Sequence, residues 1–445
     1  MQLDFTTGSI TGRLLRFALP MMAGNLLQQC YNVADTLIVG KYLGPDALAA
    51  VGSSYTLMVF LTSILLGLCM GSGAACSIQF GRQDTDRLLR SVFLSFCLIA
   101  AATVLLTIAA FLWIDPMISA LQAPPDVAPL MRSYLWIIFL GIPATFLYNY
   151  FATLLRAVGN SVIPLLFLGA SALLNVGLDL AFVLILPWGV QGAAAATVLA
   201  QFASGIGIAV YTLAAFPELR VRRRHMVWDR GILREISSLS LLTCIQQSVM
   251  NLGILMVQGL VNSFGTSVMA AFAAAVKIDS FAYMPVQDFG NAFSTFVAQN
   301  YGAGRPDRIR AGARSAVLTA GAFCIAVSAA VCLLAAPLMG LFVQPDQTEI
   351  IALGVGYLRI EGACYCGIGL LFLLYGYYRA VRRPGMSVVL TVVSLGSRVV
   401  LAHLLSSVPA LGVHGIWLSV PIGWLLADAI GLVCCRRTQA RIASA

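Results

Sequence analysis

Charged side chains are scarce in this chain, and their scarcity excludes an ordinary soluble fold. Only 10% of its 445 residues are charged, whereas 60% are apolar. A water-soluble domain carries about 25% charged residues, which keep its surface in water. We therefore expect a protein whose outer surface faces lipid.

Histidines and catalytic motifs are lacking as well. The three histidines, at positions 225, 403 and 414, are scattered along the sequence. No GxxxxGK phosphate loop, HExxH metal motif or GxSxG serine motif occurs. Of the eleven cysteines most lie inside apolar runs, where cysteine behaves as a small apolar residue. These absences predict that the protein is not an enzyme and holds no cofactor and no metal centre.

Long apolar runs dominate what is present. Twelve of them are long enough to cross a bilayer as helices. They cover residues 13–40, 50–79, 90–114, 131–154, 161–185, 190–215, 235–263, 270–300, 312–336, 352–378, 385–407 and 413–435. Alternating strand patterning is absent, and the first run is too long for a signal peptide. We predict an all-α polytopic membrane protein with twelve transmembrane helices.

The net charge of +9 reflects membrane topology. Of the 27 basic residues, 22 fall in alternate connections between the predicted spans. Basic residues collect on the cytoplasmic side of membrane proteins, so both termini are expected in the cytoplasm. This distribution speaks against nucleic-acid binding and allows some contact with anionic membrane lipids.

The sequence repeats itself with an offset of about 221 residues. Gly44–Ala50 returns as Gly265–Ala271, and Phe80-Gly81 with Asp86-Arg87 returns as Tyr301-Gly302 with Asp307-Arg308. Later matches have an offset of 223, as between Arg156-Ala157-Val158 and Arg379-Ala380-Val381. With six spans in each copy, the copies enter the membrane in the same direction, related by a pseudo-two-fold axis along the membrane normal. We expect an N-lobe over residues 1–215, a cytoplasmic linker over 216–234 and a C-lobe over 235–445, with the substrate site between the lobes.

Two acidic residues, Asp35 and Asp179, lie within the apolar spans of the N-lobe. A polar stripe on the first span contains Asn32 and Asp35, and one on the fifth contains Asn175 and Asp179. The depths of Asp35, Asp179 and Thr197 in the membrane match. A carboxylate in lipid needs a proton or a cation, which predicts an ion-coupling site at Asp35, Asn175, Asp179, Thr197 and Asn32.

The C-lobe does not repeat these residues. Met256, Arg398 and Ala402 stand where Asp35, Asn175 and Asp179 are expected. The C-lobe has instead a polar cluster of mixed sign, formed by Lys277, Asp279, Asp288, Arg359, Glu361 and Arg398. Mutual salt bridges are the favoured interpretation of this cluster, and substrate contact or a second proton site is the alternative.

Methionine and aromatic side chains on the first two spans of each copy are candidates for substrate binding. We expect Gln28, Tyr31, Tyr55, Met58, Met256, Tyr283 and Met284 to contribute, because thioethers and aromatic faces accept varied flat cations. Pro20 has two interpretations: it acts as a hinge of the first helix, or it fixes the helix start as a first-turn proline.

Several segments together resemble the multidrug and toxic compound extrusion (MATE) family. They are Asn32–Gly40 with the following Leu43-Gly44 and Ala47–Ala50, Arg156–Asn160, Asn175–Asp179 and Gln299–Gly304. Within the family the chain is most similar to the DNA-damage-inducible-F-like branch. The resemblance implies a two-lobe antiporter of the bacterial cytoplasmic (inner) membrane, which exports organic cations or drugs in exchange for H⁺ or Na⁺ by alternating access.

The same resemblance assigns the N-lobe cation site to Asp35, Asn175, Asp179 and Thr197. Acids that another branch carries on its seventh helix are missing between Ser238 and Ser263. We favour H⁺ as the coupling ion, because the site offers two carboxylates and only Asn and Thr as further oxygen ligands. Export of a single metabolite such as a flavin, and flipping of a lipid-linked oligosaccharide, stay open as alternatives. We expect a monomer.

Overall fold

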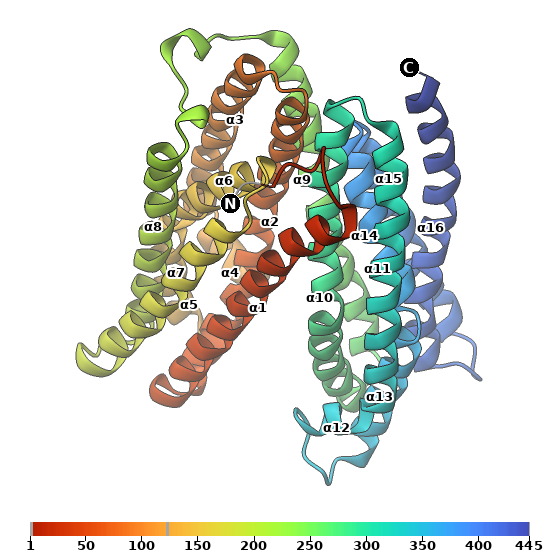
Figure 1. Ribbon diagram of the computed structural model, residues 1–445. Helices are drawn as coiled ribbons and strands as arrows, with labels where there is room; N and C mark the ends of the chain where they lie inside the picture. The colour runs from red at the N-terminus through yellow and green to blue at the C-terminus, as the bar shows by residue number, and fades with distance from the viewer. Residues whose placement is uncertain (1–2, 122–123, 445) are drawn as a thin grey trace. The chain divides into compact units, whose positions relative to one another are not determined.

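The computed structural model describes residues 3–121 and 124–444, and every regular element in these ranges is helical. The first half contains the following elements, shown in Figure 1: α1 (Ile10–Leu43), α2 (Pro45–Gly81), α3 (Thr85–Leu112), α4 (Ile114–Ala120), α5 (Ala128–Leu140), α6 (Ile142–Ala157), α7 (Val162–Leu180), the π-helical η1 (Ala181–Ile185) and α8 (Gly189–Ala215). Two short 3₁₀ helices, η2 (Pro217–Leu219) and η3 (Arg223–His225), lie in the linker.

The second half follows the same plan. Its helices are α9 (Arg230–Asn262), α10 (Thr266–Gly302), α11 (Pro306–Leu333), α12 (Ala335–Gly340), α13 (Thr348–Gly362), α14 (Tyr365–Ala380), α15 (Pro384–Ser406) and α16 (Val413–Ser444).

The twelve predicted spans are confirmed, two of them as bent pairs of helices. Nine helices of the described ranges have the length and apolar composition of a membrane span, and the pairs α5–α6 and α13–α14 supply two more, bent by 43° and 51°. The 34-residue α1 completes the set, although its polar stripe makes it less apolar than the others. The sequence analysis predicted neither the two bends nor the short helices α4 and α12.

The backbone confirms that the halves are copies. Left-handed residues, which have positive φ, occur in pairs at the two sequence offsets: Gln83 with Gly304, Gly44 with Gly265, Gly159 with Arg382, and Gly189 with Gly412. In two of these pairs only one member is glycine, the residue that adopts this conformation without steric cost. The turn geometry has therefore been kept where the residue has changed, so the two copies share a backbone plan.

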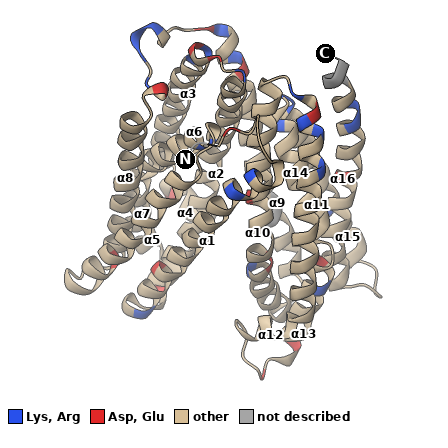
Figure 2. Ribbon diagram, viewed as in Figure 1, with Lys and Arg blue, Asp and Glu red and all other residues tan. Residues whose placement is uncertain are grey.

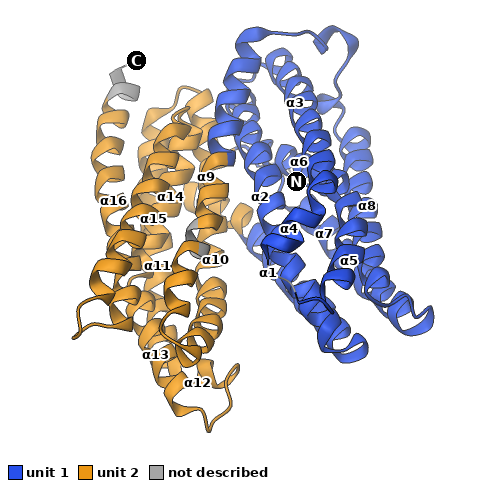
Figure 3. Cartoon of the chain, turned by 180° about the vertical axis from the view of Figure 1, so that it is seen from behind, with its two compact units in different colours: residues 1–4, 19–244 blue, residues 5–18, 245–445 orange. Residues whose placement is uncertain are grey.

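The chain divides into two compact units, coloured separately in Figure 3. Unit 1 comprises Leu19–Cys244 with Leu3 and Asp4, and unit 2 comprises Phe5–Ala18 with the chain from Ile245 onward. The start of α1 thus packs with unit 2, and the start of α9 packs with unit 1. The predicted lobes differ from these units at both places. They assign the start of α1 to the N-lobe and the start of α9 to the C-lobe, because each lobe was predicted as one continuous stretch of sequence.

The linker docks onto unit 1. Asp86, at the start of α3, lies 3.1 Å from Nε2 of His225 and 3.3 Å from Nη2 of Arg224. The carboxylate of Glu235 accepts from Arg87 at 3.4 Å. Figure 2 shows basic residues gathered on the linker, while the middle parts of the surrounding helices carry few charges.

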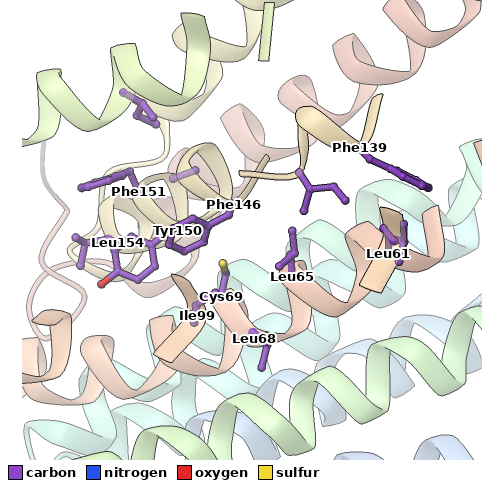
Figure 4. Packing of buried hydrophobic residues seen from close by; sticks show 14 of the residues in the cluster. Leu61, Leu65, Leu68, Cys69, Ile99, Phe139, Phe146, Tyr150, Phe151 and Leu154 are labelled. Atoms are coloured by element: carbon purple, nitrogen blue, oxygen red, sulfur yellow. The ribbon is translucent and has the colours of Figure 1, made fainter. Parts of the chain in front are cut away.

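Helix packing in unit 1 combines an apolar cluster with close contacts at glycines. Figure 4 shows the side chains of α2, α3, α5 and α6 that interdigitate, among them Leu65, Ile99, Phe139 and Tyr150. Lipid is as apolar as these side chains, so dispersion contacts and close approach drive helix association in a membrane. A Cβ atom on Gly71 would overlap the backbone of Leu239 and Ser240, so glycine at this position allows α2 and α9 to pack closely.

Replacement of Gly71 by alanine should destabilise unit 1. The added Cβ would stand 2.5 Å from the Cα of Ser240, so α2 and α9 must move apart. Overpacking of this kind costs about 1–3 kcal/mol, and it should lower the melting temperature of the purified protein in detergent. Gly52→Ala, on the same helix with open space around it, is the matched control. An equal effect of both substitutions would contradict the packing argument.

Candidate functional site

Two acidic side chains from distant parts of the sequence meet inside unit 1. Asp35 lies eight residues before the end of α1, and Asp179 is the penultimate residue of α7 and is fully buried. Their carboxyl groups are within hydrogen-bonding reach of each other. Two ionised carboxylates have no proton to share, so this contact requires either a bound proton or a cation.

The amide of Asn175 extends the site towards α8. Asn175 lies one turn before Asp179 on α7, and its Nδ2 donates to Oγ1 of Thr197 at 3.3 Å. The hydroxyl of Thr197 in turn donates to the carbonyl of Ala193 at 3.1 Å. This chain of donors orients Asn175 so that its Oδ1 atom is left as an acceptor. Asn32 is one turn before Asp35, and its backbone carbonyl accepts from Thr36 at 2.8 Å.

Four buried oxygen atoms of this site have no donor among the described residues. They are Oδ1 of Asp35, Oδ1 of Asn175 and both carboxylate oxygens of Asp179. Buried acceptors are almost always satisfied in folded proteins, so a set of four calls for a ligand. A proton shared by the carboxyls fits these atoms. A sodium ion would need further oxygens, from water or backbone.

Tyr134 is a neighbour of the site that the sequence analysis missed. This buried residue of α5 is within electrostatic range of both Asp35 and Asp179. A tyrosine in an apolar helix carries no distinctive pattern, and only the packing of α5 places it here. The π-helical turn η1 begins two residues after Asp179. Such turns are rare and are found frequently at functional sites.

Arg132 does not neutralise the pair. Its Nε atom donates to Oδ1 of Asp115 on α4 at 2.7 Å, and both side chains are more than half exposed.

The predicted substrate residues of unit 1 lie next to the acidic pair. The hydroxyl of Tyr31 interacts with Gln28 and is within electrostatic range of Tyr55 and Asp35. Gln28 is exposed, and Tyr55 is 51% exposed. Met58 instead packs against the apolar clusters of the unit. An aromatic and amide surface therefore adjoins the carboxyl group of Asp35.

The predicted substrate residues of unit 2 also differ in how far they are exposed. Met256 is 60% exposed on α9, while Tyr283 and Met284 are half-buried on α10. The ring of Tyr283 lies 6.0 Å from that of Phe372, and its hydroxyl is within electrostatic range of Asp279 and Glu361.

Five members of the polar cluster of unit 2 form no salt bridge with one another in the part of the chain that the structure describes, which corrects the favoured interpretation for these five. No pair of Lys277, Asp279, Arg359, Glu361 and Arg398 approaches within 4 Å in the described ranges. Lys277 and Arg359 are exposed, whereas Asp279 and Glu361 are buried, so the two signs face different surroundings.

Two tyrosines and one base lie near these buried acids. Tyr365 and Arg398 are within electrostatic range of Asp279, and Tyr357 and Arg398 are within electrostatic range of Glu361. The hydroxyl of Tyr365 has no hydrogen-bond partner among the described residues. Asp288 is buried on α10 and has interactions of its own. A further buried acid, Asp428 on α16, was missed by the sequence analysis; its Oδ1 has no hydrogen-bond partner among the described residues.

Pro20 lies in the interior of α1, which begins at Ile10. The interpretation as a first-turn proline is therefore wrong. Inside a helix, proline removes the N–H that would bond to the carbonyl four residues earlier, here that of Arg16. The hinge stays a prediction.

Comparison with known proteins decides the family. The MatE family model matches residues 20–181 and 240–404, which is more than half of the chain and one segment in each copy. The chain belongs to the MatE family. It is a multi-pass membrane transporter and not an enzyme.

Relatives and solved structures agree with this membership. The chain is 29% identical to the probable multidrug resistance protein YpnP of Bacillus subtilis, over 88% of this chain and 87% of that protein. It is 26% identical to an FAD transporter of Shewanella oneidensis, over 95% of this chain and 92% of that protein. A crystal structure of MATE in complex with MaL6 matches the fold with a TM-score of 0.93 at 23% identity, over 99% of both chains.

Replacing either carboxyl of this MatE transporter by an amide, in Asp35→Asn or Asp179→Asn, should abolish ion-driven transport. An amide neither releases a proton nor carries the charge that attracts a cation, so we expect a loss of at least about tenfold. Substrate uptake into vesicles with equal amounts of inserted protein is the measurement. Asp115→Asn, which removes an exposed acid of the same unit, is the matched control. Full activity of both site variants would show that the pair is not the coupling site.

Proposed function

We propose that the protein exports organic cations, drugs among them, across the bacterial cytoplasmic membrane in exchange for protons. The observation that carries this proposal is the contact between the carboxyl groups of Asp35 and Asp179, which needs a proton or cation to form. The names of relatives such as YpnP support drugs as substrates. Cytoplasmic termini, the monomeric state and the DNA-damage-inducible-F-like branch are part of the same proposal.

Exchange would follow from competition for negative charge. A flat cation lying against Tyr31 and Tyr55 gains cation–π attraction, and the charge of Asp35 adds to it. Protonation of the pair from outside removes that charge. A unit charge about 4 Å away contributes about 4 kcal/mol at an effective dielectric constant of 20, roughly a thousandfold in affinity. The proton would thus release the cation on the side where protons are abundant.

The ion can be identified in inside-out membrane vesicles. We expect that an acidic vesicle interior drives uptake of a fluorescent cation without added sodium, because the site has two carboxyls and few further oxygen ligands. A sodium gradient at uniform pH should have no effect. Uptake that depends strictly on sodium would overturn the assignment of the proton.

A substrate panel tests the range of cargo. Ethidium, a fluoroquinolone and a flavin should be compared in the same vesicles, with the Asp179→Asn variant as the background. We expect uptake of more than one chemically distinct cation, since methionine and aromatic faces impose no single shape. The FAD transporter among the relatives makes a flavin exporter the second candidate. Uptake of the flavin alone would establish that candidate and contradict multidrug export.

A further inference from the structure

The end of α10 and the start of α11 hold a polar cradle that takes no part in the ion site. It consists of Gln299, Asn300, Arg305 and Arg308, of which Arg308 belongs to the repeated pair Asp86-Arg87 and Asp307-Arg308. Gln299 and Asn300 are both 0% exposed. Buried amide side chains are normally hydrogen-bonded. Here their hydrogen-bond partners include the backbone of Phe5, in the segment Phe5–Gly8 near the start of the chain.

Every backbone carbonyl of Phe5–Gly8 accepts a hydrogen bond from the cradle. Asn300 Nδ2 donates to the carbonyl of Phe5 at 3.1 Å, and Arg305 Nη1 donates to that of Thr6 at 2.8 Å. Arg308 Nη2 donates to the carbonyls of Phe5, Thr7 and Gly8 at 3.0, 2.9 and 3.2 Å.

Two further contacts complete this arrangement. The N–H of Phe5 donates to Gln299 Oε1 at 3.1 Å. The guanidinium of Arg308 is itself positioned, because its Nε donates to Oδ1 of Asn300 at 3.2 Å. One guanidinium therefore joins three carbonyls, a geometry that a lysine cannot reproduce.

Apolar packing also holds the segment Phe5–Gly8 in unit 2. The ring of Phe5 is fully buried and meets Phe17 and Phe296 edge to face, at centroid distances of 5.2 and 5.8 Å. Phe17 is on the second turn of α1, and Phe296 is on α10. In the first turn of α1, the hydroxyl of Thr11 lies 2.7 Å from that of Ser315 on α11. The first turns of α1 are thereby built into unit 2.

The rest of α1 belongs to unit 1, and it carries Asp35. A single helix thus has its beginning fixed in one unit and its ion-binding residue in the other. The start of α9 is attached to unit 1 in the corresponding way, but with different chemistry. Arg87, the counterpart of Arg308, bonds the side-chain carboxylate of Glu235 on α9 at 3.4 Å rather than a row of carbonyls. A single carboxylate can shift and still accept a hydrogen bond from Arg87. Four consecutive carbonyls can bind the cradle in only one position of the chain.

We propose that Arg308 and Asn300 are positioning residues that anchor the start of α1 to unit 2 throughout the transport cycle. The anchor passes movement of α1, driven by ion exchange at Asp35, to unit 2. This proposal rests on the proposed function only where it invokes movement of α1. The attachment of α1 to unit 2 can be measured without a transport assay.

Proteolysis of the purified protein measures the attachment directly. Trypsin cleaves after Arg13 and Arg16, which lie in the anchored turns of α1. Arg308→Ala should accelerate cleavage at these sites by at least roughly tenfold, because local opening then costs less free energy. Arg308→Lys should give an intermediate rate. Arg310→Ala is the matched control, since this exposed arginine of the same helix pairs with Asp307 at 3.8 Å and takes no part in the cradle. An unchanged cleavage rate in Arg308→Ala would overturn the anchor.

A reversible crosslink tests the role in transport. The hydroxyl oxygens of Thr11 and Ser315 stand 2.7 Å apart, close to the sulfur separation of a disulfide, about 2 Å. The pair Thr11→Cys and Ser315→Cys should therefore crosslink under mild oxidation. Because the anchor stays closed, transport by the crosslinked protein should equal that after reduction. The wild type, with its eleven native cysteines, is treated identically as the control.

Rescue separates anchoring from a general structural role. Arg308→Ala should lower the maximal transport rate at least about fivefold and leave the apparent KM unchanged, because the cradle does not touch substrate. Adding the Thr11–Ser315 crosslink to this variant should restore the rate, and dithiothreitol should remove the restored activity. A crosslink that stops transport in the otherwise native protein, or one that fails to rescue Arg308→Ala, would overturn the proposal. Absence of transport in the wild type would instead refute the proposed function and leave the proteolysis result standing.

Discussion

Inside a membrane a carboxylate has no water to solvate it, and this constraint gives the contact between Asp35 and Asp179 its meaning. Each acid alone would be an expensive defect in an apolar helix. Together they form a place where a proton or a cation lowers the free energy, and the surrounding groups are arranged accordingly. Thr197 accepts from the Nδ2 atom of Asn175, which leaves the buried Oδ1 atom of Asn175 without a donor among the described residues.

The two copies share a backbone and differ in chemistry. Paired left-handed residues and paired bends show that duplication preserved the path of the chain. The side chains have diverged: Arg398 stands at the position of Asn175, and the buried acids of unit 2 are accompanied by tyrosines. Polar groups in lipid are costly, so a structural requirement common to both copies would have kept the same residues. Asymmetry of this kind favours a separate task for each unit.

Helices α1 and α9 link the two units through the chain itself. Each begins in one unit and continues in the other, so neither unit can change without affecting a helix of its partner. The attachments differ in strength and geometry. Four carbonyls in the Arg308 cradle define one position, whereas the single carboxylate bonded by Arg87 does not. The start of α1 therefore has one defined position in unit 2.

The sequence by itself determined the twelve spans, the duplication and the acids within the membrane, because apolar runs, repeats and isolated charges are local features. It also placed Asp35 and Asp179 at one depth, since helical rise converts residue number into position. Only the tertiary structure decided which partners meet. Tyr134 looks like an ordinary helix residue until packing surrounds it. Asp428, by contrast, is an isolated acid in the apolar run 413–435 and could have been found from the sequence. The expected salt bridges of unit 2 failed because similar depth does not make side chains on different helices face each other. The place of Phe5–Gly8 in unit 2 was likewise invisible, since its partners are nearly 300 residues away along the chain.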